Sequence, residues 1–274
     1  MTPGQPSRTA LRAAAHRAAH QTCEGGRVFR DPLAPAILGD EPQSVLGPDL
    51  DAAPVRSMRL FIAARSHFAE QRLAAAVARG VRQYVVLGAG LDTFALRNPF
   101  ADLKVFEVDH PATQAWKRER SREAALAPSQ TLTFAPVDFE RQTLAAGLAA
   151  AGFQAGEPAF FAWLGVVVYL TRTAVFETLA YIAGGAHEVV FDYGEPNAAF
   201  PKDRQPWLAA REARLAQMGE PWLTRFEPPE LATKLSELGF DEVEDLGPGE
   251  IAARFLDLPG REGPGGHLVS ARVT

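Results

Sequence analysis

The sequence predicts an α/β fold in which a mostly parallel sheet carries helices on both faces. Helical and strand patterns alternate from about residue 54 onward, which is typical of this class. The first strand pattern, 84–87, is a short apolar run that ends abruptly in the glycines of 88–90, as a buried parallel strand does before a turn. The last two strand patterns are only about twenty residues apart, so the sheet can end in an antiparallel hairpin.

The chain before this alternation has a helical pattern. Residues 1–23 contain three arginines and no acid, and their apolar residues recur at helical spacing: Ala10, Leu11, Ala14, Ala15 and Ala18. An arginine-rich, acid-poor start is also typical of a transit peptide, and this alternative stays open. A second helix is expected to begin at Pro54, to run to about residue 77 and to stop at Gly80.

Strands and helices then follow in turn. Apolar runs predict strands at 84–87, 104–109, 131–137, 159–164, 189–193, 241–246 and 267–273. Helices are expected at 111–125, 142–151, 171–184, 229–238 and 250–255. Thr171 is the expected N-cap of its helix. Residues 196–227 break the alternation, because they are polar, helical and rich in proline, and they are interpreted as an inserted lid.

Composition excludes several classes of protein. The chain has 274 residues, 47% of them hydrophobic, and can bury a sizeable core. Its single cysteine, Cys23, excludes an intramolecular disulfide and favours a reducing compartment, so a cytoplasmic location is expected. The net charge of -5 and the lack of a basic stripe disfavour a nucleic-acid partner. The apolar run at 160–170 is too short to span a membrane.

A glycine turn follows the first predicted strand. Gly88-Ala89-Gly90 would let a ligand approach the backbone closely. The third glycine of the dinucleotide fingerprint would stand at position 93, which is Thr93. This argues against a nicotinamide cofactor held through its pyrophosphate.

Acidic residues end the next two strands. Asp109, about 20 residues after the turn, stands where a carboxylate holds a ribose diol. Asp138 ends the third strand and could accept a hydrogen bond from an adenine amine, while Phe139 could lie on the ring face. The three strand ends therefore present groups in the order that a nucleoside needs, although each acid alone could equally be a helix cap or a solvent-facing strand end.

Several motifs together resemble the leucine carboxyl methyltransferase-like family of class I methyltransferases, including bacterial members linked to polyketide tailoring. They are 86–93 (VLGAGLDT), 106–111 (FEVDHP) and 163–171 (WLGVVVYLT), with weaker signals at 190–193 (VFDY) and 29–32 (FRDP). The resemblance implies a Rossmann-like sheet of seven strands with the last antiparallel, and S-adenosylmethionine as cofactor. Its implied cofactor-binding residues are Arg65, Gly88, Ala89, Gly90, Asp109, His110, Asp138 and Phe139. Arg65 would bind the methionine carboxylate through a bidentate guanidinium pair.

The implied domain organisation is an N-terminal helical segment, 1–80, covering the cofactor site of a methyltransferase domain, 81–274, whose lid insertion is at about 196–227. Two positions depart from the family pattern. Leu164 stands where some members have glutamate, and Phe94 where members often have arginine. The second departure favours a branch that acts on small molecules.

The resemblance therefore predicts an O-methyltransferase that acts on a carboxylate or hydroxyl of a small molecule. In the branch that the sequence resembles, this molecule is a secondary metabolite of the polyketide type. An ionised carboxylate acceptor needs no base, whereas a hydroxyl benefits from one. Tyr169, Tyr193 and His67 are the weak candidates for a polar catalytic neighbour. No metal site is expected, and the partners expected are a small-molecule acceptor and, at most, a second copy of the chain.

The lid aromatics suggest an apolar acceptor; they are Trp207, Met218, Trp222 and Phe226. Two alternatives stay open. One is an S-adenosylmethionine-binding protein without transferase activity, which Leu164 and the absence of an obvious base keep open. The other is a nicotinamide oxidoreductase, which Thr93 disfavours.

Overall fold

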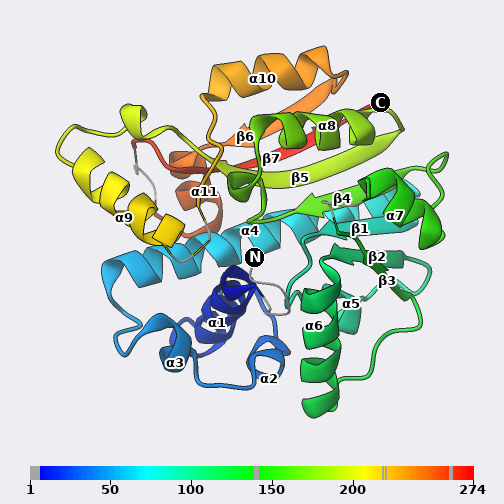
Figure 1. The fold of residues 1–274 in the computed structure, drawn as a ribbon, viewed down its shortest axis with the longest axis horizontal. Coiled ribbons are helices and arrows are strands. Elements are labelled where there is room, and N and C mark those ends of the chain that lie inside the picture. Colours follow the sequence, from blue (N-terminus) through cyan, green and yellow to red (C-terminus); the bar gives the residue numbers. More distant parts are fainter. Residues whose placement is uncertain (1–6, 139–141, 218, 220, 259–261) are drawn as a thin grey trace. The chain divides into compact units, whose positions relative to one another are not determined.

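The computed structural model describes residues 7–138, 142–217, 219, 221–258 and 262–274. The chain folds as two compact units, one formed within Pro3–Gln154 and the other within Ala155–Thr274 (Figure 1). The predicted domain division near residue 80 concerns the role of the N-terminal segment and stays a prediction.

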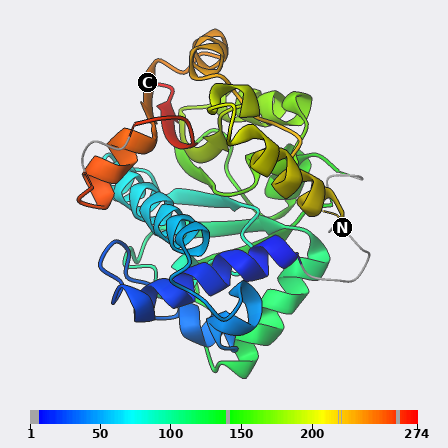
Figure 2. The ribbon, with the colours of Figure 1, turned by 90° about the vertical axis from the view of Figure 1, so that its left-hand side faces the viewer.

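The first unit begins with four helices. They are α1 (Arg8–Cys23), α2 (Ala34–Leu38), α3 (Pro42–Leu46) and α4 (Ala53–Ala78). Ser7 caps α1 by accepting a hydrogen bond from the Ala10 N–H, at an N–O distance of 3.2 Å. The alanines at 14, 15 and 18 are buried, as their helical spacing predicts. Helix α1, in dark blue, packs against α2 and α3 (Figure 2).

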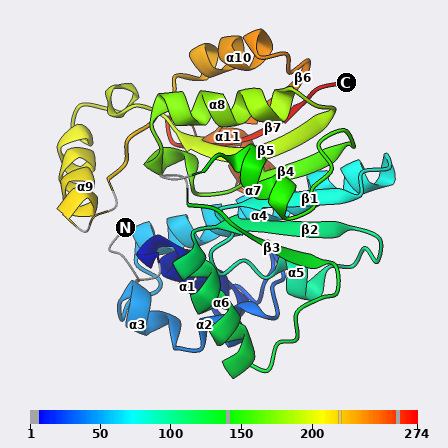
Figure 3. The same cartoon turned by 45° about the vertical axis from the view of Figure 1, so that its right-hand side comes forward.

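Three parallel strands complete the first unit, in the order β3-β2-β1. Their bounds are β1 (Gln83–Leu87), β2 (Lys104–Asp109) and β3 (Leu132–Pro136), and the helices among and after them are α5 (Phe94–Arg97), α6 (Pro111–Glu123) and α7 (Leu144–Ala150). Every residue of β1 is buried. The parallel register aligns Leu87 with Val108 and Asp109 with Pro136, so the carboxyl ends of the strands lie together (Figure 3).

The second unit has the strand order β4-β5-β7-β6. Its strands are β4 (Ala159–Trp163), β5 (His187–Gly194), β6 (Glu242–Leu246) and β7 (Gly266–Arg272). Its helical elements are η1 (Val167–Tyr169), α8 (Arg172–Ala183), η2 (Asn197–Ala199), α9 (Gln205–Gln217), α10 (Pro228–Glu237) and α11 (Pro248–Phe255). Strands β4 and β5 are parallel, and β7 runs antiparallel to both β5 and β6. Helix α8 lies along β5 (Figure 3).

The predicted fold class is confirmed: seven strands, mostly parallel with β7 antiparallel, alternate with helices. Thr171 caps α8 as expected, because its side chain accepts from the Ala174 N–H. Three short helices, α2, α3 and α5, were not predicted. Across the described residues, no helix is both long and apolar enough to span a membrane.

Candidate cofactor site

The glycine turn after β1 is joined to the end of β2 by the backbone. The Gly88 and Ala89 N–H groups both donate to the Val108 carbonyl, at N–O distances of 2.8 and 3.1 Å. Gly88 and Gly90 have φ angles of +68° and +50°, a left-handed conformation that glycine adopts without strain. The turn therefore depends on glycine at both positions, and it brings the predicted residues 88–90 to the carboxyl end of β2.

Asp109 links this turn to the start of α6. Its Oδ2 accepts from the Gly90 N–H at 2.6 Å, and its Oδ1 accepts from the His110 N–H at 2.7 Å. Burial raises the pKa of the Asp109 carboxyl, although both of these hydrogen bonds favour its ionised form. Each carboxylate oxygen has a second lone pair, so the oriented carboxylate can still accept from two hydroxyl groups. That acceptor capacity fits a ribose diol.

The end of β3 lies beside the carboxyl end of β2. The Val137 N–H donates to the carbonyl of Asp109, the last residue of β2, at 3.0 Å. Half-buried Asp138, the next residue along the chain, therefore lies just past the end of β2. The structure therefore brings Gly88, Asp109 and Asp138 to one edge of the sheet. Phe139 lies outside the described residues. The adenine role of Asp138 stays a prediction.

His110, which the resemblance implied as a cofactor residue, caps α6. Its Nδ1 accepts from the Ala112 N–H at 3.2 Å, and Pro111 occupies the first helical position. This hydrogen bond orients the imidazole ring at the helix start, directly after Asp109. A cofactor contact of His110 would have to use the rest of the ring.

Helix α1 joins the glycine turn to Arg65 of α4. A Cβ built on Gly90 would stand 2.9 Å from the Ala10 Cβ, so only glycine lets α1 approach the turn this closely. Six residues along α1, His16 is buried. Its burial, together with the charges of nearby arginines that include Arg65, lowers its pKa to about 3. Arg65 and the glycine turn thus border the same helix.

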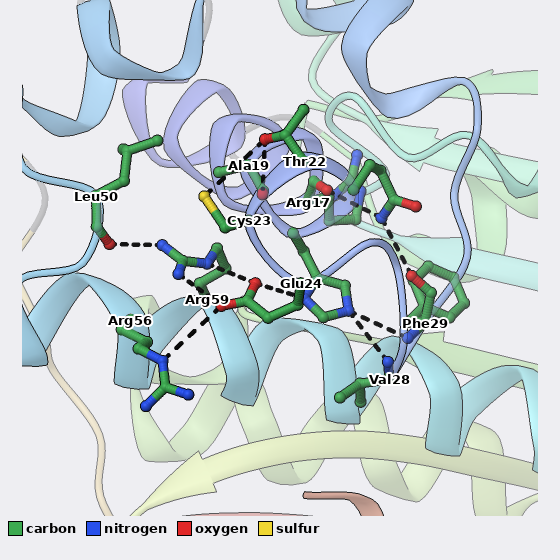
Figure 4. A network of polar contacts seen from close by, with 12 residues as sticks. Arg17, Ala19, Thr22, Cys23, Glu24, Val28, Phe29, Leu50, Arg56 and Arg59 are labelled. Atoms are coloured by element: carbon green, nitrogen blue, oxygen red, sulfur yellow. Dashed lines mark hydrogen bonds and ion pairs between the residues drawn. The ribbon is translucent and has the colours of Figure 1, made fainter.

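An ion pair fastens the end of α1 to α4 (Figure 4). The Arg59 Nε and Nη2 donate to the two Glu24 carboxylate oxygens at 2.8 and 2.6 Å, and its Nη1 donates to the Leu50 carbonyl at 2.6 Å. Arg59 is fully buried, so this bidentate pair is strong and well oriented. It holds α1 in place beside the predicted cofactor residues.

Sequence reasoning missed a buried polar network that supports the glycine turn. Asp31, fully buried, accepts from the Arg17 Nε at 3.3 Å and from the Thr93 Oγ1 at 2.7 Å. Arg17 also donates to the Leu91 carbonyl at 2.5 Å. The resemblance at 29–32 was the available signal, and the structure gives it a physical meaning: Asp31 ties the N-terminal segment to the residues after the turn.

The weak catalytic candidates His67 and Tyr169 belong to different units, and their catalytic roles stay predictions. His67 bonds through Nδ1 to the Val28 carbonyl, with a separation of 2.6 Å, beside a surface hollow of about 530 Å³. Tyr169 is half-buried in η1 of the other unit. Another hollow, of about 520 Å³, lies beside Ala18 and Pro35. Neither hollow is bordered by Gly88, Asp109 or Asp138.

Tyr193 belongs to a hydrogen-bonded cluster of the second unit. Its hydroxyl donates to the Asp245 Oδ2 at 2.6 Å, and its ring stacks on His267. Burial and the Asp245 carboxylate raise the pKa of Tyr193 far above its ordinary value. His267 lies between Asp245 and Glu195, with N–O distances of 2.8 and 3.1 Å. This environment gives Tyr193 a place in the packing of β5, β6 and β7 and makes it a poor base.

Two resembling motifs of the second unit meet directly. The Gly165 N–H, from the segment after β4, donates to the Asp192 Oδ1 of β5 at 2.5 Å. Gly165 has a φ of +71°, which explains the glycine in that motif. Of the lid aromatics, Phe226 is fully buried against Phe176 and Tyr193, so it belongs to the core and cannot face an acceptor. Met218 lies outside the described residues.

A group of three or more His, Cys, Asp or Glu side chains suited to a metal ion does not occur within the described part of the chain.

Comparison with known proteins gives a consistent result. The leucine carboxyl methyltransferase family model matches residues 10–183, more than half of the chain. A Bacillus subtilis protein, provisionally named as an S-adenosyl-L-methionine-dependent methyltransferase, is 34% identical over 199 residues, which are 70% of this chain and 65% of that protein. A Mycobacterium avium protein with the same provisional name is 33% identical over 239 residues, covering 80% of this chain and 74% of its own length. The chain thus spans slightly less than two thirds of the first relative.

Solved structures share the fold. Magnesium protoporphyrin IX methyltransferase from Synechocystis, crystallised with bound SAH, superposes with a TM-score of 0.50 at 10% identity, covering 96% of this chain and all of that one. A Bordetella parapertussis protein gives a TM-score of 0.52 at 14% identity, covering 100% of this chain and 99% of that one. At these identities the likeness concerns the fold alone.

Proposed function

The chain belongs to the leucine carboxyl methyltransferase family of S-adenosylmethionine-dependent methyltransferases, and from this premise we propose that it methylates an oxygen atom of a small molecule. The family description names methylation of a carboxyl group, which is a transfer to oxygen. A secondary metabolite of the polyketide type, carrying a carboxylate or a hydroxyl, is the acceptor class that the sequence resemblance favours.

The observation that carries the proposal is the orientation of Asp109. Its carboxylate is fixed by the Gly90 and His110 N–H groups and keeps acceptor capacity for the ribose diol. Arg65, beside α1, would pair with the methionine carboxylate. Asp138 and Phe139 would flank the adenine. The cofactor, when bound, supplies a sulfonium whose methyl group is already activated for displacement.

The protein then has to align the acceptor and exclude water. Methyl transfer is an in-line displacement, so positioning accounts for much of the rate. An ionised carboxylate attacks without a base, whereas a hydroxyl must lose its proton to a neighbouring group or to water. Tyr193 is unsuited to take that proton, because its own hydroxyl donates to Asp245 and its pKa is raised.

Transfer of a tritiated methyl group from S-adenosylmethionine to a panel of aromatic acids and phenols tests the proposal. We expect label in an ester or ether product, which alkaline hydrolysis distinguishes because only the ester releases methanol. Cofactor binding with no transfer to any acceptor in the panel would favour the alternative of a binding protein without activity.

The nicotinamide alternative is disfavoured by the structure of the turn. Helix α5, which follows it, has only four residues, so it offers little of the helix dipole on which a pyrophosphate rests. Thr93, at the position of the third fingerprint glycine, is fully buried and bonded to Asp31. The proposal further takes the enzyme to be cytoplasmic and to act as a monomer or homodimer. The exposed free thiol of Cys23 suits a reducing compartment.

A further inference from the structure

A buried ion pair joins α6 to β2. The Lys117 Nζ donates to the Glu107 Oε2 at 2.6 Å, and the two side chains are only 2% and 1% exposed. The Glu107 Oε1 is also buried and has no hydrogen-bond partner among the described residues. Burying two charges is costly, and an apolar pair of similar size would often stabilise the fold as well. Stability alone therefore does not account for this pair.

The pair lies on the strand face that carries Asp109. Glu107 and Asp109 are two residues apart in β2, so their side chains point to the same face of the sheet. Helix α6 contacts both: at its start the His110 N–H donates to the Asp109 Oδ1 at 2.7 Å, and further along Lys117 reaches Glu107. Gln114 adds a bond from its Nε2 to the Glu107 carbonyl at 2.7 Å. One helix thus orients both carboxylates of the strand.

The charge of Lys117 acts on three acidic side chains near the glycine turn. Burial raises the pKa of Glu107 and of Asp109, and the Lys117 ammonium opposes both rises. Burial would raise the pKa of Asp92 as well, but the charges of Arg17 and Lys117 lower it below its ordinary value. Lys117 is therefore a shared counter-charge for the carboxylates at this end of the sheet.

Asp109 needs such a counter-charge for the role proposed for it. An ionised carboxylate accepts at both oxygens, whereas a protonated one has turned one oxygen into a donor. The titratable groups around Asp109 are Glu107 on β2, Asp92 after the glycine turn, and His110 and Lys117 of the α6 segment. The two acids oppose further negative charge, while an ammonium stabilises it.

We propose that Lys117 is a positioning residue of the cofactor site: held by Glu107, its buried ammonium keeps the Asp109 carboxylate charged and docks the helix that orients it. The benefit to the ribose contact rests on the proposed function, while the effect of Lys117 on Asp109 does not. Lys117 itself touches neither cofactor nor acceptor in this scheme.

The Gly90 amide provides a direct probe of Asp109. Its N–H donates to the Asp109 Oδ2 at 2.6 Å, so its NMR shift follows the ionisation of that carboxylate as pH is varied. In Lys117→Met, which removes the cation at similar size, the midpoint of this titration should rise by about one pH unit. In Glu107→Gln, which removes an anion at the same size, the midpoint should fall.

The opposite directions separate the proposed role from a merely structural one, because both variants break the same ion pair. Arg118→Met, which removes the exposed cation next to Lys117, is the control and should leave the midpoint unchanged. Melting curves check that the variants are folded. Midpoints that move in the same direction, or an unchanged midpoint in Lys117→Met, would overturn the proposal. Should Lys117→Met not fold, Glu107→Gln decides alone, and a midpoint that does not fall would count against the role of these charges.

Calorimetry with S-adenosylhomocysteine over the same pH range tests the consequence for the cofactor. The pH below which affinity falls should be highest in Lys117→Met and lowest in Glu107→Gln, since the ribose contact requires an ionised Asp109. Equal pH profiles in all variants would show that Lys117 does not serve the cofactor site. Shifted Gly90 midpoints in a protein that does not bind S-adenosylhomocysteine would instead contradict the proposed function and leave the effect of Lys117 on Asp109 established.

Discussion

Asp109 has a structural role, and the proposed ribose contact would add a binding role to the same side chain. It holds the glycine turn through the Gly90 N–H and the start of α6 through the His110 N–H. These bonds leave each carboxylate oxygen a lone pair that can accept from the proposed ribose. A residue of this kind is sensitive to truncation, because both the turn and the ligand lose a charged acceptor.

Replacing Asp109 with alanine should weaken S-adenosylhomocysteine binding by about 1.5–3 kcal/mol, the range for a hydrogen bond to a charged group. Isothermal calorimetry gives the change directly. Asp102→Ala, at an exposed turn of the same unit, is the matched control and should bind as the wild type does. Wild-type affinity in the Asp109 variant would show that the ribose lies elsewhere.

His16 makes stability depend on pH. Burial and the charges of Arg12, Arg59 and Arg65 lower its pKa from 6.5 to about 3. Below about pH 6.5 the unfolded chain therefore binds a proton at His16, whereas the folded chain binds it only at much lower pH. The contribution of His16 to stability is full above that pH and is lost as pH falls.

His16→Gln, which cannot titrate, should flatten the acid side of the stability profile. Between about pH 6 and 4 the wild type should lose about 1.4 kcal/mol per pH unit more than the variant does, the value for one linked proton. Urea denaturation at several pH values measures this difference. Parallel profiles for the two proteins would mean that His16 titrates normally in the folded state.

At the scale of elements, α8 shows how one capping residue defines a helix start. The Thr171 Oγ1 accepts from the Ala174 N–H at 3.3 Å, and this satisfies one of the N–H groups that a helix leaves unbonded at its first turn. Thr171 is exposed, so its side chain contributes through this cap more than through packing.

Thr171→Ala should lower the free energy of unfolding by about 1 kcal/mol, since alanine cannot cap. Thr173→Ala is the control within the same helix. Thr173 is also exposed but lies inside α8, where alanine is the better helix former, so its replacement should be neutral or slightly stabilising. Denaturation by urea compares the two variants, and equal effects would argue against the capping role.

At the scale of the whole molecule, a bound cofactor should stabilise the folded chain. A ligand that binds only the native state at one hundred times its Kd adds about 2.7 kcal/mol. S-adenosylhomocysteine should therefore raise the melting temperature by several degrees, and NADH should not. Thermal scans with each ligand measure both. A rise with NADH alone would revive the nicotinamide alternative and contradict the assignment of the turn.

The sequence by itself determined the features that local chemistry encodes. The strand predicted at 84–87 is β1 (Gln83–Leu87), and the glycine turn follows it with Asp109 at the end of β2, because apolar runs and turn glycines are properties of neighbouring residues. The same holds for α4 and for the Thr171 cap. Helices α2, α3 and α5 have only four or five residues, which is too few for a periodic pattern to show.

Only the tertiary structure decided which polar groups become partners. Asp31 meets Thr93 across 62 positions of the chain, and Arg17 meets the Leu91 carbonyl across 74. It also decided which groups are buried without a partner among the described residues, such as the Trp222 Nε1, and it placed Phe226, one of the lid aromatics, in the core. The physical reason is that burial and hydrogen bonding depend on what packing brings alongside a residue, and distant segments leave no trace of that in the local pattern.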